Sequence, residues 1–195
     1  MKKFLTFLMA FALLLGATSC TSCNKEKQKM ENVVETVIKS DLNYMSQNYG
    51  SFVWYESSIT LNDYLDAEDC TGTVAQIVNI FQTGFNDSTV SDQKVVMITH
   101  NDELMFVKEI QGFWCEDLVL DFAELNYTYR QAYERIMATD CIKPHSKFCV
   151  LRKPLGPRTC NAQYIFGNAN DDELLFLDAV TGDVRTENPA FNPLE

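Results

Sequence analysis

Cysteine and histidine are the side chains with which this chain of 195 residues could carry out nucleophilic chemistry. There are seven cysteines but only two histidines, His100 and His145. His145 closely precedes Cys149, yet a Cys/His nucleophile pair also needs spatial reach and an orienting third group. We therefore interpret His145 as a loop residue beside a structural cysteine and His100 as an exposed polar turn residue beside Asn101. No catalytic residue is assigned, and the chain is predicted not to be an enzyme.

Metal-binding patterns are equally weak. The polar run Asn168–Glu173 could attract calcium, but it lacks the glycine and the distal glutamate of an EF-hand loop, so an ordinary hairpin turn is favoured. The scattered cysteines lack the closely spaced pairs that are typical of zinc sites. We therefore predict no metal site and no cofactor.

The charge balance narrows the class of partner. The 27 acidic side chains outnumber the 16 basic ones, which gives a formal net charge of −11. An acidic chain repels phosphate backbones, so no nucleic-acid partner is expected. A hydrophobic content of 46% and an aromatic content of 12% predict a folded rather than a disordered chain.

The N-terminal segment predicts export. After Lys2 and Lys3, the apolar run Phe4–Leu15 is shorter than the roughly 20 residues of a transmembrane helix and is typical of a secretory signal. Small residues then precede Cys20, which resembles a bacterial lipobox. The resemblance implies a lipoprotein with a signal peptide at residues 1–19 and acyl chains such as palmitate on Cys20.

Such a protein would be attached to the lipid bilayer in the cell envelope of a Gram-negative bacterium, at the outer membrane. Cys23 is the alternative lipidation site, and cleavage by an ordinary signal peptidase without lipid stays open. Residues 20–29 are polar and are interpreted as a flexible tether.

Export also makes disulfides plausible among the other cysteines. Cys149 and Cys160 lie in two segments with strand composition, separated by the turn signal Pro154–Pro157. Hairpin pairing would bring these two cysteines together, so they are the disulfide candidates, with the register left open.

An internal repeat indicates the domain organisation. Residues 102–112 and 172–182 share Asp, Glu, Leu, Phe and Gly at matching positions, and an apolar strand-like run precedes each of them. The spacing of apolar residues predicts helices over 30–49 and 127–138, the second with Asn126 as a possible N-cap. Residues 73–85 also fit helical spacing, but their β-branched composition favours a strand.

We therefore expect an α+β protein with two units, residues 30–118 and 119–195, each a helix with antiparallel strands. The first unit is longer, with an insertion at roughly residues 51–70. One compact ectodomain would result, in which a single sheet has one face covered by both helices.

The second unit resembles the PepSY domain. The resemblance rests on a helix, two strands and then Asp178-Ala179-Val180-Thr181-Gly182, and the chain is thus similar to a tandem, β-lactamase-inhibitor-like PepSY-type protein. In the first unit Lys108-Glu109-Ile110-Gln111 replaces Asp178 to Thr181, so that copy is degenerate. Independently of the family, Thr181-Gly182 predicts a turn, because glycine tolerates a positive φ.

Two further features have both a functional and a structural interpretation. Ser88, within Asp87-Ser88-Thr89, resembles the O-glycosylation acceptor of one group of Gram-negative anaerobes, but a plain turn is favoured. Aromatic side chains could form a ligand surface, although core packing is the stronger expectation. These aromatic residues are Trp54, Tyr55, Phe113 and Trp114.

The PepSY resemblance implies protein binding rather than catalysis. The expected function is that of a non-enzymatic, lipid-anchored envelope protein that binds a protein or peptide and regulates an exported protease. An envelope ligand-binding or sensing module is the alternative.

Overall fold

A computed structural model of the chain describes residues 33–63, 72–84, 93–101, 104–114, 118–139, 146–167 and 174–191. All of these except Val33 belong to one compact unit, Val34–Glu195, and the description below concerns that unit. In chain order its elements are α3 (Val33–Asn48), β1 (Phe52–Leu61), β2 (Val74–Thr83), β3 (Lys94–Asn101), β4 (Leu104–Gln111), η2 (Phe122–Glu124), α4 (Tyr129–Ala138), β5 (Phe148–Arg152), β6 (Gln163–Gly167), β7 (Leu174–Asp178) and β8 (Val184–Arg185).

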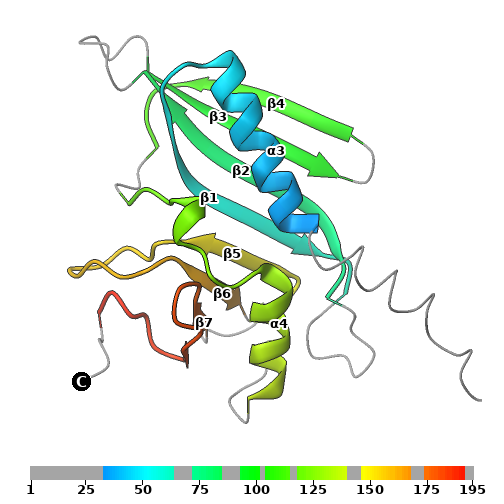
Figure 1. Cartoon of the computed structure of the whole chain (residues 1–195), viewed down its shortest axis with the longest axis vertical. Helices are drawn as coiled ribbons and strands as arrows, with labels where there is room; N and C mark the ends of the chain where they lie inside the picture. The colour runs from blue at the N-terminus through cyan, green and yellow to red at the C-terminus, as the bar shows by residue number, and fades with distance from the viewer. Residues whose placement is uncertain are drawn as a thin grey trace, which may run out of the picture. The chain divides into compact units, whose positions relative to one another are not determined.

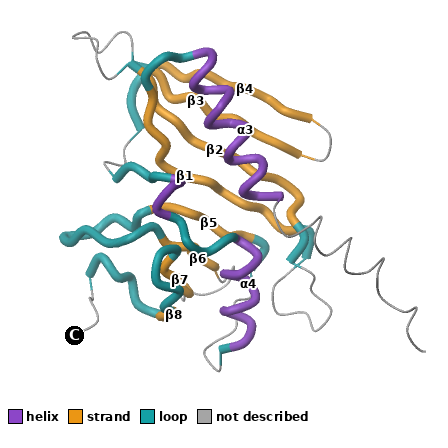
Figure 2. Tube along the Cα trace, viewed as in Figure 1, coloured by secondary structure: helices purple, strands orange, loops and turns teal. Residues whose placement is uncertain are grey.

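The strands of the described residues form one antiparallel sheet in the order β4-β3-β2-β1-β5-β6-β7-β8. Each helix is followed by four strands that pair in succession, and the first strands of the two sets, β1 and β5, pair at the centre (Figures 1 and 2). The predicted α+β class and the single sheet are confirmed. The expected insertion at 51–70 is wrong in part, because its residues 52–61 form β1, the counterpart of β5.

Local composition explains most of these elements. The β-branched run at 73–85 does form a strand, β2. The helix predicted over 30–49 is described as α3, and Gly50 follows it with a φ of 59°, a conformation that glycine adopts without a steric penalty. The N-cap of α4 is Thr128, not Asn126, because Thr128 and Gln131 form a reciprocal capping box.

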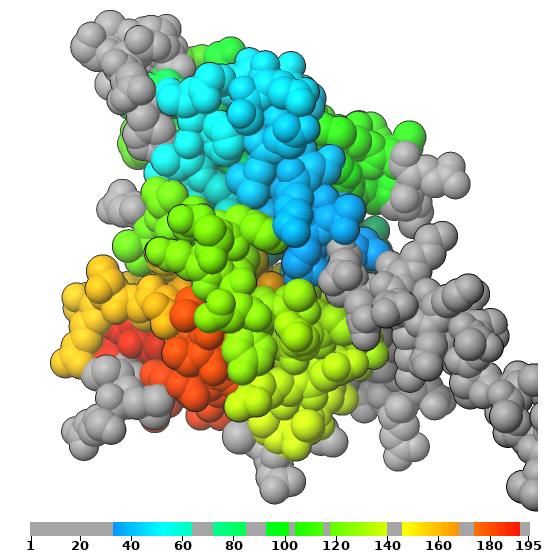
Figure 3. All heavy atoms as spheres, in the orientation of Figure 1, coloured from blue at the N-terminus to red at the C-terminus, as the bar shows by residue number. Residues whose placement is uncertain are grey.

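Both helices pack on the same face of the sheet. Figure 3 shows the atoms of α3 (blue) and α4 (yellow-green) over this face. Buried side chains of both helices join those of the strands in one hydrophobic core, and each fully buried side chain of this size contributes roughly 1.5–3 kcal/mol. They include Ile38, Met45, Phe81, Ile98, Ile136, Leu151, Tyr164 and Leu177.

A buried carboxylate joins the two helices. Glu35, on α3, accepts a hydrogen bond from the backbone amide of Tyr129 at 2.6 Å, in the first turn of α4, and one from the hydroxyl of Tyr164 at 3.5 Å. A negative group is favoured at this helix end, because the amides there carry partial positive charge. Burial nevertheless dominates and raises the pKa of Glu35 above its ordinary value.

Candidate binding groove on the open face of the sheet

The strand registers divide the side chains between a helix-covered face and an open face. On the open face of β5, β6 and β7, a polar row lies beside two apolar rows. The polar row begins on β1 and consists of residues that lie directly opposite one another on adjacent strands: Glu56, Arg152, Gln163 and Asp178. The apolar rows are Val150, Ile165 and Phe176, followed by Phe148, Gly167 and Leu174.

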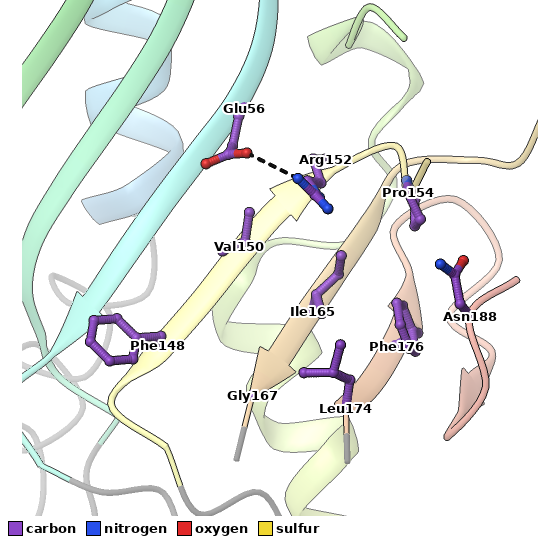
Figure 4. A pocket seen from close by; sticks show the side chains of 10 residues that line it. All are labelled: Glu56, Phe148, Val150, Arg152, Pro154, Ile165, Gly167, Leu174, Phe176 and Asn188. Carbon is purple, nitrogen blue, oxygen red and sulfur yellow. Dashed lines mark ion pairs between the residues drawn. The ribbon is translucent and has the colours of Figure 1, made fainter. Parts of the chain in front are cut away.

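The two apolar rows, together with Glu56 and Arg152 of the polar row, line a groove of about 360 Å³. Figure 4 shows Val150, Ile165 and Phe176 projecting side by side from adjacent strands, with Pro154 and Asn188 at one end. Gly167 lies in the row between Phe148 and Leu174 and leaves a hollow there, because it has no side chain. The result is a depression with an apolar floor and a charged border, which is the composition of many binding sites.

A bulge in β1 supplies part of the charged border. The register of β1 against β2 shifts between Trp54 and Glu56, so Glu56 points to the open face although Trp54 points to the helices. There the Glu56 carboxylate lies 3.6 Å from the Arg152 guanidinium and accepts a hydrogen bond from the Ser58 hydroxyl at 2.7 Å. The bulge therefore moves a carboxylate from the core side to the border of the groove.

The predicted motif residues form a turn at the other end of the polar row. One oxygen of Asp178 accepts hydrogen bonds from the backbone amides of Val180 and Thr181, each at 2.9 Å. Ala179 is fully buried, and its carbonyl accepts the amides of residues 126 and 127 ahead of α4. The residues at the corresponding position of the first repeat, 108–111, form no such turn and lie on the exposed strand β4. The motif is thus a structural device that holds the segment before α4 against β7.

Gly182 is required in this turn for two reasons. Its φ is 79°, a backbone conformation that residues other than glycine rarely adopt. A Cβ atom at this position would also clash with the ring of Tyr127. The predicted glycine turn is therefore confirmed, and the close approach of Tyr127 adds a steric reason that the sequence did not reveal.

His100 is not the exposed turn residue that we expected. It lies on β3, and its Nε2 is 2.8 Å from the buried carboxylate of Asp41 on α3. The side chain of Asn79 donates to the other oxygen of Asp41 at 2.7 Å and accepts a hydrogen bond from the Ser57 hydroxyl. Burial raises the pKa of Asp41, while Asn79 and His100 oppose that rise. This buried hydrogen-bond network links α3 to β1, β2 and β3.

The expected disulfide between Cys149 and Cys160 is not formed. The predicted hairpin exists, since β5 pairs with β6, but its register sets Cys149 opposite Phe166 and leaves Cys160 ahead of β6. Both thiols are free. Burial raises the pKa of both, and for Cys160 the nearby Asp178 carboxylate raises it further. Neither is disposed to form the thiolate that nucleophilic chemistry requires.

The four aromatic residues do not form one ligand surface. Trp54 and Tyr55 are buried, which confirms core packing for these two. Phe113 is 68% exposed, so core packing is wrong for this residue. Trp114 is half-buried, and its backbone amide donates to Gln82 at 2.9 Å.

Several predicted sites lie outside the described residues. They are the lipidation sites Cys20 and Cys23, the glycosylation candidate Ser88, His145 and the acidic run Asn168–Glu173. Within the described ranges, no group of three or more metal-ligating side chains comes together. No helix in the same ranges is long and apolar enough to cross a membrane.

The fold and the groove thus define an α+β protein in which two helices cover one face of an eight-stranded antiparallel sheet. Comparisons of the chain with protein-family models, curated proteins and solved structures gave no match.

Proposed function

We propose that this protein is a non-enzymatic, lipid-anchored envelope protein that binds an extended segment of another protein, with an exported protease as the partner. The open-face groove is the observation on which this proposal rests. The order of elements, a helix and four strands twice over, supports the resemblance to tandem PepSY-like units. Those units are associated with binding and regulation of proteases rather than with turnover.

Ile165 and Phe176 on the floor of the groove are buried, but the end of the groove at Phe148 and Leu174 is exposed, which supports binding there. Phe148 is 55% exposed and Leu174 is 39% exposed, although both lie in a continuous apolar patch of the sheet. Exposed apolar patches that are bordered by polar groups are typical of interaction sites. An apolar side chain of the partner would enter the hollow at Gly167, and polar groups of its backbone would face Glu56 and Arg152.

Filling the hollow tests this proposal. Gly167 does not have a positive φ, and a Cβ there would lie 3.5 Å from the Ser146 hydroxyl and 3.7 Å from the Leu174 side chain, which are ordinary contacts, so the backbone accepts a side chain and Gly167→Leu is a suitable variant. The assay measures inhibition of co-encoded exported proteases and their capture by the chain. Gly167→Leu should reduce both at least tenfold. Phe113→Ala removes an exposed aromatic ring outside the groove and should change neither, so it is the matched control.

The proposal is wrong if no protease is inhibited or captured by the wild-type chain, or if Gly167→Leu binds as the wild type does. Thermal unfolding of each variant shows whether a loss of binding reflects a loss of folding.

A small apolar ligand is the second candidate, because the groove volume lies in the lower part of the range that such ligands occupy. Under this alternative the chain is an envelope ligand-binding or sensing module. Displacement of a fluorescent apolar dye from wild type, but not from Gly167→Leu, together with the absence of protease capture, would favour it.

The lipid anchor has its own test. In cells that express the full chain, Cys20→Ala should move the protein from the membrane fraction to the soluble fraction. Release by Cys23→Ala alone would assign the lipid to Cys23, and membrane retention by both single variants and the double variant would refute lipid anchoring.

A further inference from the structure

The two edges of the sheet are unlike each other. β8 contains only two residues, Val184 and Arg185, and a short edge strand offers little to a partner strand. β4 spans Leu104–Gln111, and all of its residues are exposed. Among the described strands, β3 alone pairs with β4, so the outer edge of β4 is open.

β4 is also unusually apolar for an open edge. Natural edge strands are generally protected by charges, proline or bulges. β4 has no register shift against β3, and its only charged side chains are Lys108 and Glu109. Its exposed apolar side chains are Leu104 (61%), Met105 (43%), Phe106 (52%), Val107 (39%) and Ile110 (40%).

The hydrogen bonds to β3 show which backbone groups of β4 point outward. The amide of Gly112 donates to the carbonyl of Gln93, in the same register as the ladder that pairs Gln111 with Lys94. Hydrogen-bonded and non-hydrogen-bonded pairs alternate along an antiparallel ladder. The even-numbered residues of β4 therefore bond to β3, whereas the amides and carbonyls of Met105, Val107 and Glu109 point away from the sheet.

We propose that β4 pairs with β4 of a second copy of this chain, antiparallel and centred on Val107, so that the two sheets become one. A two-fold axis normal to the sheet keeps each face continuous, so opposite residues must point to the same face. Centring on Val107 places it opposite itself and Met105 opposite Glu109, all with outward backbone groups. About six main-chain hydrogen bonds would form between these residues.

Charge and the overlap of the two strands select this register over its neighbours. With Val107 at the centre, Lys108 lies opposite Phe106, Leu104 lies opposite Ile110, and no like charges oppose each other. Centring on Lys108 would place two ammonium groups face to face, which is destabilising. Centring on Phe106 would leave Glu109 and Ile110 of β4 without opposite residues on the partner's strand.

The apolar rows favour a second copy over an unrelated peptide. In the pair, Leu104 and Ile110 lie side by side on one face and the two Val107 side chains on the other, so each copy shields the same apolar side chains of its partner from water. This dimerisation is independent of the groove, which lies on β5 to β7 at the other half of the sheet.

Charge reversal at the two-fold axis tests the register. Sedimentation of the full chain over a range of concentrations should give a dimer for wild type. Val107→Lys and Val107→Glu should each be monomeric, because identical charges would meet at the axis, and an equimolar mixture of the two should restore a dimer. Val107→Thr, a β-branched control of similar size, should remain dimeric.

The proposal is overturned if wild type is monomeric at every concentration, or if both charged variants dimerise as the wild type does. A failure of the mixture to dimerise would overturn the Val107-centred register. If the charged variants do not fold, amide exchange of wild type decides. The amides of residues 105, 107 and 109 should exchange at least tenfold more slowly in concentrated than in dilute samples, whereas unchanged exchange refutes the pairing.

Discussion

The carboxylate of Glu35 should make stability depend on pH in a direction opposite to that of most acidic side chains. Burial raises its pKa above the ordinary value of 4.5, so the folded state favours the neutral form. The contribution of Glu35 to the free energy of unfolding is therefore fully present below pH 4.5 and is lost as the pH rises through the folded-state pKa. The loss amounts to about 1.4 kcal/mol for each unit by which the folded pKa exceeds the unfolded one.

Two substitutions separate the charge of Glu35 from its hydrogen bond. Glu35→Gln keeps an oxygen that can accept the Tyr129 amide but does not titrate, so it should become more stable relative to wild type as the pH rises from 4 to 8. Glu35→Ala removes the acceptor at 2.6 Å and should destabilise the protein by about 1–3 kcal/mol even at low pH.

Urea unfolding across this pH range measures both effects. Glu134→Gln is the matched control, because it removes the same charge from a side chain of α4 that is 58% exposed. It measures the effect of removing one surface charge and its ion pair with Arg130, which as an exposed pair contributes little to stability. The reasoning is refuted if Glu35→Gln differs from wild type by the same amount at every pH, or if Glu35→Ala is as stable as Glu35→Gln.

Three other substitutions or treatments probe the remaining buried groups. Asn79→Ala should lower the free energy of unfolding, measured by urea denaturation, by about 3 kcal/mol, because Asp41 on α3 and Ser57 on β1 both lose a buried hydrogen-bond partner. An unchanged midpoint would contradict this role. Gly182→Ala should cost at least about 2 kcal/mol through backbone strain and the clash with Tyr127, and Tyr127→Ala in the same chain should restore only part of that loss. Cys149 should resist alkylation in the native protein and react once urea unfolds it, whereas the less buried Cys160 should react faster, as mass spectrometry of the labelled peptides would show.

The elements of the fold could be predicted because local composition determines them. The β-branched run of β2 and the apolar hairpin strands have strong local preferences. The boundary of α4 was missed although the sequence contains its signal, since Thr128 and Gln131 have the spacing of a capping box. The sequence favours a turn at His100, because it does not show that β3 continues to Asn101.

The groove and the buried hydrogen-bond network around Asp41 could not be predicted, because both depend on contacts between distant segments. The bulge beside Glu56 and the register of β1 against β5 determine which side chains share a row, and neither is visible in one sequence. The hydrogen bond between Asp41 and His100 likewise requires α3 to lie against β3. The disulfide prediction failed for the same reason, since it needed the register of one hairpin.

The central pairing of β1 with β5 makes this protein a natural candidate for fragment complementation. A cut in the connection between β4 and η2 would leave two polypeptides, each with a helix and four consecutive strands. Each would expose a former central strand, and the edge of β1 that pairs with β5 through Glu56–Thr60 would be open. Neither half has another strand for that edge among the described residues, so the two fragments should be poorly soluble apart and should reassemble when they are coexpressed. The protein could then serve as a split reporter whose signal depends on the β1–β5 pair and on the core that the two halves share.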